Sequence, residues 1–152
     1  MSVPATIAPQ ISIRKAEARD AAAIARLAGE LGYASSVAQG AARLSAIADD
    51  PQHAVFVAEA RGGELIGWIH IRESRTLEAD VHGEIMGLVV DAQHRSAGAG
   101  RLLVERGEQW ARERGLKIMG VRSNVIRDRA HEFYLRQGYA VVKWQKAFRK
   151  NL

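Results

Sequence analysis

The stretch Arg95–Gly100 joins two segments with different hydrophobic periods. The apolar run Ile85–Val90 before it predicts a buried strand, and the amphipathic pattern of Arg101–Arg114 after it predicts a helix. Such a turn leaves backbone N–H groups unpaired at a helix N-terminus, where an anion is stabilised, and glycines let them approach phosphate oxygens closely. The stretch is therefore either a nucleotide-phosphate site or a tight turn that required flexible residues.

The residues in and around Arg95–Gly100 distinguish between the known types of phosphate-binding turn. A Rossmann turn has a third small residue where Leu103 stands and an acid at the end of the next strand, which here ends Val121-Arg122-Ser123. A P-loop has Gly-Lys-Ser/Thr, which this stretch lacks. Arg95 instead precedes Gly98 by three residues, giving the pattern Q/R-x-x-G-x-G/A. In this pattern the chain resembles the GNAT superfamily of acyl-CoA-dependent N-acyltransferases, whose loop binds the pyrophosphate of acetyl-CoA.

A second segment carries the same resemblance. Asn124 follows the strand pattern Lys117–Val121, and Ala130, Phe133-Tyr134 and Gly138 come after it. This order is similar to the family signature N-x(5)-A-x-x-F-Y…G-Y/F. The resemblance extends over residues 11–150, with these two segments specific, and implies that Asn124 and Tyr134 face the pantetheine and sulfur end of CoA.

Periodicity and turn residues predict the element order β-α-α-β-β-β-α-β-α-β. The expected strands are Ile11–Lys15, His53–Ala60, Leu65–Arg72, Val81–Val90, Lys117–Val121 and Tyr139–Lys150. Of the expected helices, the first has Asp20 as its N-cap, the second begins at Val37, the third spans Arg101–Arg114, and the fourth carries Ala130, Phe133 and Tyr134 on one face. This is an α/β fold with a GNAT-like mixed, mostly antiparallel central sheet flanked by about four helices. The resemblance further implies that the fourth and fifth strands splay apart and that CoA enters the gap.

Composition limits the remaining classes of protein. A chain of 152 residues with 47% hydrophobic residues predicts one domain over residues 11–152, after an N-terminal tail at 1–10. The absence of cysteine excludes disulfides, a thiol nucleophile and a cysteine-based zinc site. Without a basic leader or a long apolar run, a soluble cytoplasmic protein is expected.

Charge and histidine placement argue against two further kinds of site. The net charge of +5 suits an anionic cofactor such as CoA, and the arginines are spread along the chain, which argues against nucleic-acid binding. The five histidines share no spacing that would gather three on a metal, so no metal site is expected. His82-Gly83-Glu84 is either a local proton relay or part of a polar surface.

Amide-forming transfer from a thioester needs a base for the amine, a donor for the oxyanion and an acid for the leaving thiolate. The resemblance places Glu84 as the candidate base and Tyr134 as the candidate acid. A backbone N–H near Leu88 is the candidate oxyanion donor if Gly87 marks a bulge, and strand alternation predicts that Glu84 shares a face with Met86 and Leu88. The residues expected to bind acetyl-CoA are Leu88, Val89, Val90, Arg95, Ser96, Ala97, Gly98, Ala99, Gly100, Arg101, Asn124 and Tyr134.

The resemblance implies that the acceptor binds at the loop between the first two helices, the entrance of the fourth strand and the last strands. These segments carry Glu30, Tyr33, Glu78, Asp80 and Glu84. Carboxylates there would attract a cationic amine, such as a polyamine or an aminoglycoside-like compound. The sequence leaves open a protein lysine or N-terminus as the acceptor, and also a non-catalytic acyl-CoA sensor. The strand-like segment Tyr139–Lys150 offers an edge that could pair in a homodimer.

Overall fold

The computed structural model describes residues 10–152, so the predicted tail lies almost entirely outside the described residues. The chain forms two compact units, one ending at Arg122 and the other running from Ser123 to Leu152. Each unit is described by itself below.

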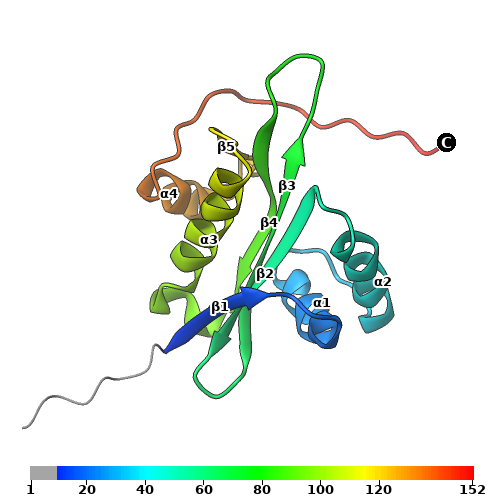
Figure 1. Cartoon of the computed structure of the whole chain (residues 1–152), viewed down its shortest axis with the longest axis vertical. Helices are drawn as coiled ribbons and strands as arrows, with labels where there is room; N and C mark the ends of the chain where they lie inside the picture. The colour runs from blue at the N-terminus through cyan, green and yellow to red at the C-terminus, as the bar shows by residue number, and fades with distance from the viewer. Residues whose placement is uncertain (1–9) are drawn as a thin grey trace, which may run out of the picture. The chain divides into compact units, whose positions relative to one another are not determined.

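The first unit contains a five-stranded sheet in the order β1-β2-β3-β4-β5 (Figure 1). The pairs β1–β2, β2–β3 and β3–β4 are antiparallel, and β4–β5 is parallel. The strands span Ile11–Lys15, His53–Ala60, Leu65–Ser74, His82–Val90 and Met119–Val121. The bounds agree with the predicted strands within two residues because turn residues end each apolar run.

Helices cover both faces of this sheet (Figure 1). The helices α1 (Ala21–Glu30) and α2 (Val37–Ala48) lie on one face, and α3 (Ala99–Glu113) lies on the other. Short 3₁₀ helices, Ala18–Asp20 and Ala92–Ala97, precede α1 and α3.

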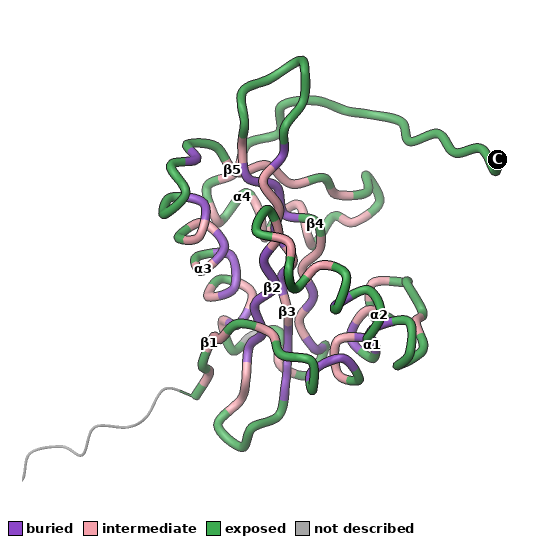
Figure 2. Tube along the Cα trace, turned by 45° about the vertical axis from the view of Figure 1, so that its right-hand side comes forward, coloured by how far each residue is buried: buried purple, intermediate pink, exposed green. Residues whose placement is uncertain are grey.

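Alternating residues of the strands build two layers of core, drawn as the purple centre of Figure 2. On the α1 face, Leu27 packs with Val57 and Val89. On the α3 face, Gly107 lies so close to β3 that an added Cβ would be 2.8 Å from the Cδ1 atom of Ile71. The helix can approach the sheet this closely because position 107 has no side chain.

Two polar contacts fix where the early elements begin. The Ser36 hydroxyl accepts the backbone N–H of Gln39, and the Gln39 side chain accepts the N–H of Ser36, so α2 starts with a capping box. Asp20, predicted as a helix cap, instead binds Arg14 through both carboxylate oxygens at 2.7 and 2.8 Å and accepts the N–H of Glu17. These contacts hold the pKa of Asp20 below its usual value.

The second unit contains α4, Asp128–Arg136. Gly138 follows it in the left-handed region at φ 93°, a conformation that favours glycine just after a helix. The predicted strand Tyr139–Lys150 does not form: these residues have no secondary structure, and most of their side chains are exposed. A strand needs a neighbour for its backbone groups, and this segment pairs with none of the described strands. The predicted fold class is confirmed, and the final strand is the difference.

Candidate active site

The turn between β4 and α3 has the geometry that the Arg95–Gly100 pattern predicted. The Asp91 carboxylate accepts the N–H of Gln93 at 2.9 Å and so caps the 3₁₀ helix Ala92–Ala97. Gly98 then adopts φ 87°, a conformation that residues with a Cβ rarely adopt, and serves as the N-cap of α3. The glycine at this position is therefore required by the backbone.

The turn presents backbone donors at the start of α3. The first hydrogen bond of this helix runs from the N–H of Leu102 to the carbonyl of Gly98, so the amides of Ala99, Gly100 and Arg101 precede it. Such amides have no partner within their own helix and carry the positive end of its dipole. Arg95 and Arg101 add exposed cations, although Arg101 also pairs with Glu105 at 2.8 Å. This part of the turn is suited to an anion.

The last part of β4, next to the turn, has an edge that pairs with none of the described strands. This agrees with the expectation that β4 and β5 splay apart. Among the described residues, β4 pairs with β5 only over Gly83–Ile85, against Met119–Val121. The backbone of Leu88, Val89 and Val90 lies beyond this pairing. Its polar groups on that side could accept an extended chain as an added strand.

A bulge in β4 corrects the predicted orientation of Glu84. Cα partners run Ile71 with Ile85 and then His70 with Gly87, so Met86 is the extra residue. Because of this insertion, Glu84 shares a face with Gly87 and not with Met86 and Leu88. The alternation rule failed because the sequence did not specify the position of the bulge.

Packing against a neighbouring side chain explains why residue 87 is a glycine. An added Cβ would lie 2.9 Å from the Trp68 ring, so the indole fills the space of a side chain at 87. The Trp68 indole N–H in turn donates to the carbonyl of Ile24 in α1, at 3.2 Å. The glycine at this position is thus matched by a tryptophan on the neighbouring strand.

Glu84 is buried and ion-paired. It is 5% exposed, and its two carboxylate oxygens lie 3.4 Å from Arg122 Nε and 3.8 Å from His82 Nε2. The structure therefore places Glu84 beside His82, at a distance longer than a hydrogen bond, and a proton relay between them stays a prediction. A buried carboxylate with polar neighbours is the kind of group that takes part in proton transfer.

The second unit contains Asn124 and Tyr134. The Asn124 side-chain oxygen accepts the N–H of Ile126 at 3.2 Å. The backbone carbonyl oxygen of Asn124 lies 2.8 Å from His131 Nε2. Tyr134 packs edge-on against Phe133 and Tyr139, and burial raises the pKa of its hydroxyl to about 12. The ring is held by neighbours and the hydroxyl stays protonated at neutral pH; that Tyr134 and Asn124 face CoA stays a prediction.

The acceptor candidates are in different surroundings. Tyr33, between α1 and α2, is 69% exposed, and Glu78 and Asp80 are exposed between β3 and β4. Glu30 accepts the backbone N–H of Ala92 at 3.2 Å, so it contacts the start of the turn between β4 and α3. The structure thus connects an acceptor candidate to the cofactor turn, which spacing along the sequence could not indicate.

Reasoning from the sequence missed a pair of stacked histidines. His53 Nδ1 and His70 Nε2 lie 2.9 Å apart on neighbouring strands, with ring centroids separated by 5.1 Å. Burial, with the nearby positive charges of His53 and Arg72, lowers the pKa of His70 to about 4. The two predicted strands His53–Ala60 and Leu65–Arg72 were the available signal, but the register between them was needed to bring the two rings together.

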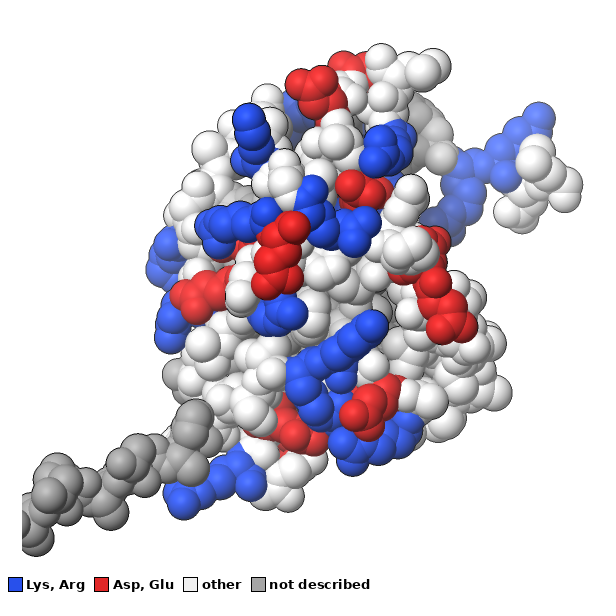
Figure 3. Space-filling view, in the orientation of Figure 1, with Lys and Arg blue, Asp and Glu red and all other residues white. Residues whose placement is uncertain are grey.

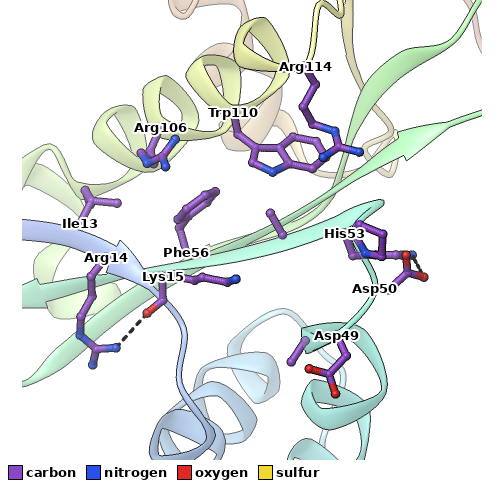
Figure 4. A pocket seen from close by; sticks show the side chains of 13 residues that line it. Ile13, Arg14, Lys15, Asp49, Asp50, His53, Phe56, Arg106, Trp110 and Arg114 are labelled. Atoms are coloured by element: carbon purple, nitrogen blue, oxygen red, sulfur yellow. Dashed lines mark hydrogen bonds and ion pairs between the residues drawn. The ribbon is translucent and has the colours of Figure 1, made fainter.

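A separate hollow of about 650 Å³ lies between β1, the end of α2 and α3 (Figure 4). Arg106 stacks over Phe56 at 4.3 Å and Arg114 over Trp110 at 4.7 Å. Figure 4 shows Arg106, Trp110 and Arg114 along the top of the view and Phe56 on the strand below them. None of the site residues predicted from the sequence lines it. We therefore do not assign the hollow to either substrate.

The surface charges, the metal-ligating side chains and the apolar helices of the described residues are as follows. Figure 3 shows Lys and Arg interspersed with Asp and Glu on the face in view, without a single basic block. Among residues 10–152, no group of three or more His, Cys, Asp and Glu side chains could hold a metal ion. No helix in that range is long and apolar enough to cross a membrane.

Comparisons with known proteins support the same family. The model of the acetyltransferase (GNAT) family matches residues 22–139. An aminoalkylphosphonate N-acetyltransferase of Salmonella typhimurium is 38% identical over 80 residues, which is 52% of this chain and 52% of that enzyme. The match therefore spans about half of that relative.

Two further proteins are similar over nearly their whole length. An aminoglycoside N(6')-acetyltransferase type 1 of Stenotrophomonas maltophilia is 29% identical over 150 residues, covering 96% of this chain and 97% of that enzyme. A solved aminoglycoside N-acetyltransferase in complex with CoA superposes with a TM-score of 0.84 at 17% identity, covering 99% of this chain and all of that one. At this identity the structural likeness is one of fold.

Proposed function

The chain is an enzyme of the GNAT acetyltransferase family, and we propose that it transfers the acetyl group of acetyl-CoA to a primary amine of a small molecule. The observation that carries the proposal is the turn at Gly98, followed by free helix amides and preceded by the open edge of β4. The amides suit the pyrophosphate, and the edge at Leu88–Val90 suits the pantetheine chain. The transfer is direct, within a ternary complex.

We propose that Glu84 removes a proton from the amine, that Tyr134 protonates the departing thiolate, and that a backbone N–H near Leu88 binds the oxyanion. The burial of Glu84 and the bulge at Met86 support the first and third roles. The second role is supported by the Tyr134 hydroxyl, which is protonated at neutral pH and whose ring is held by Phe133 and Tyr139.

The acceptor we propose is cationic and resembles an aminoglycoside or a polyamine. Two of the similar proteins are named for aminoglycosides and for aminoalkylphosphonates, both of which carry amines. Carboxylates at Glu30 and Glu84, with Tyr33 exposed nearby in the chain, suit a positively charged acceptor. A protein lysine or N-terminus is the alternative acceptor, and a non-catalytic sensor of acyl-CoA is the alternative role.

A screen for CoA thiol release tests these alternatives together. The panel contains aminoglycosides, polyamines, an aminoalkylphosphonate and lysine-containing peptides, and the assay has no background from the protein because it lacks cysteine. Turnover with a small cationic amine supports the proposal. Turnover with peptides alone assigns a protein acceptor, and acetyl-CoA binding without turnover on any amine assigns a sensor.

A further inference from the structure

Helix α1 contacts the phosphate-binding turn through two side chains on one of its faces. Arg26 and Glu30 are four residues apart, so they lie on neighbouring turns of the same helix face. Arg26 contacts Asp91, and Glu30 contacts Ala92, the next residue along the chain. Both contacts lie in the first unit, and the roles proposed so far do not explain them.

The contact at Arg26 ties the turn to the sheet. Its Nη1 lies 3.4 Å from Asp91 Oδ2, and its Nη2 donates to the carbonyl of Leu65 at 3.2 Å. One guanidinium therefore holds a residue of the turn and the first residue of β3. A planar, multiply donating group is well suited to such a bridge.

Asp91 is the centre of this contact. It is 8% exposed, its own N–H donates to Ile66 at 2.7 Å, and its Oδ1 accepts the N–H of Gln93. The N–H of Gln93, and secondarily Arg26, hold the pKa of Asp91 below its usual range. The carboxylate is therefore ionised at neutral pH and fixes the first turn of the 3₁₀ helix that leads to Gly98.

The contact at Glu30 lies at the end of α1 next to the acceptor candidate Tyr33. Glu30 is the last residue of the helix, and its Oε2 accepts the N–H of Ala92 at 3.2 Å. The segment that follows, with Gly32 in the left-handed region, carries Tyr33. A shift of the last turn of α1 would therefore move Glu30 and alter its hydrogen bond with Ala92, at the start of the turn.

We propose that Arg26 and Glu30 form a brace that holds the phosphate-binding turn in its binding shape and couples it to the segment around Tyr33. This inference rests on the proposed function. In this role Arg26, Glu30 and Asp91 are positioning residues, because they act on the backbone at 91–93 and the donors for phosphate follow later in the turn. A turn that is already ordered loses less conformational entropy on binding, which raises affinity.

The brace assigns Glu30 a role that a charge-recognition residue would not have. A glutamine at 30 keeps an oxygen that can accept the N–H of Ala92 but removes the negative charge. Glu30→Gln should therefore preserve acetyl-CoA affinity, while Glu30→Ala should lower it. If Glu30 acts only by attracting a cationic acceptor, both variants should weaken the acceptor equally and leave acetyl-CoA binding unchanged.

The test is calorimetric titration of acetyl-CoA into the wild type and into Arg26→Gln, Asp91→Asn, Glu30→Ala and Glu30→Gln. We expect the first three to raise the Kd by about 10-fold, with Glu30→Gln within about 2-fold of wild type. In the double variant of Arg26→Gln and Asp91→Asn, the Kd should rise by less than the product of the two single effects, because both substitutions remove the Arg26–Asp91 contact. Arg19→Gln, which removes an exposed pair with Glu17, is the matched control and should bind normally.

Hydrogen exchange separates loss of the brace from loss of the fold. We expect faster exchange at the amides of Ala92 and Gln93 in the Arg26→Gln variant, with the strand amides of β2 and β3 unchanged. Unchanged exchange and affinity in Arg26→Gln and Asp91→Asn would overturn the brace. If wild type itself binds no acetyl-CoA, the proposed function fails first, so the two failures are distinguishable.

Discussion

Tyr134 allows the sharpest test at a single residue, because Tyr134→Phe keeps the ring and removes only the proton donor. A thiol leaves more readily than an alkoxide, so we expect kcat to fall about 10- to 100-fold, or about 1.4 to 2.8 kcal/mol. Acetyl-CoA affinity should persist, since the Gly98 turn is unchanged. Rapid-quench measurement of the chemical step decides it: an undiminished step would assign Tyr134 to packing against Phe133 and Tyr139.

Glu84→Gln tests the proposed base. We expect the largest loss of turnover at pH values where the acceptor amine is mostly protonated, because a base contributes least when free amine is abundant. Acetyl-CoA affinity should change little. A pH profile of kcat/KM checks this, and a uniform loss across the profile would assign Glu84 to holding Arg122 and His82.

The lowered pKa of His70 predicts that the free energy of unfolding depends on pH. Its folded pKa of about 4 lies below the usual 6.5, so between these values the unfolded chain binds a proton that the folded chain does not. Stability should therefore fall as pH drops through this window, by about 2 kcal/mol at about pH 5. Urea unfolding of wild type and His70→Gln between about pH 7.5 and 5 measures it. Equal pH slopes for the two proteins would contradict the prediction.

The turn before α3 is the element on which cofactor binding depends. Gly98 has φ 87°, and an added Cβ would meet no atom within 4 Å, so backbone strain and not a protein clash opposes substitution. We expect Gly98→Val to reduce acetyl-CoA binding at least about 10-fold, because a β-branched residue is an outlier in this region. Gly98→Asn, which tolerates the conformation better, should retain more affinity. Calorimetry ranks the two variants, and tight binding by a folded Gly98→Val protein would refute the site.

The elements also show how far the sequence alone could lead. Helix and strand bounds followed from periodicity and from turn residues such as Gly98 and Gly138, which act over a few residues. The bulge at Met86 depends on packing between strands, so alternation misassigned the face of Glu84. The contacts of Glu30 with Ala92 and of His53 with His70 join distant parts of the chain, and no local pattern reports them.

For the molecule as a whole, the feature to account for is the exposure of large apolar side chains in the C-terminal segment. Five of its large apolar side chains are more than half exposed: Val141, Val142, Trp144, Phe148 and Leu152. Large apolar side chains exposed along one short segment favour an interaction site, and a segment that pairs with none of the described strands has backbone groups available for pairing. We propose that a second copy of the chain covers this segment and that the protein is a homodimer.

Light scattering after size exclusion tests the dimer. We expect a mass twice the 16.6 kDa of one chain for wild type, and a shift to monomer when Trp144→Ser and Phe148→Ser are combined, because burial of two aromatic side chains is lost. Lys143→Ser, in the same segment, is the matched control and should remain dimeric. Since the paired segment would also be protected, limited proteolysis should cut after Lys146 or Arg149 faster in the double variant. A wild-type monomer at micromolar concentration would contradict the proposal and would leave the apolar side chains of 141–152 to a different partner.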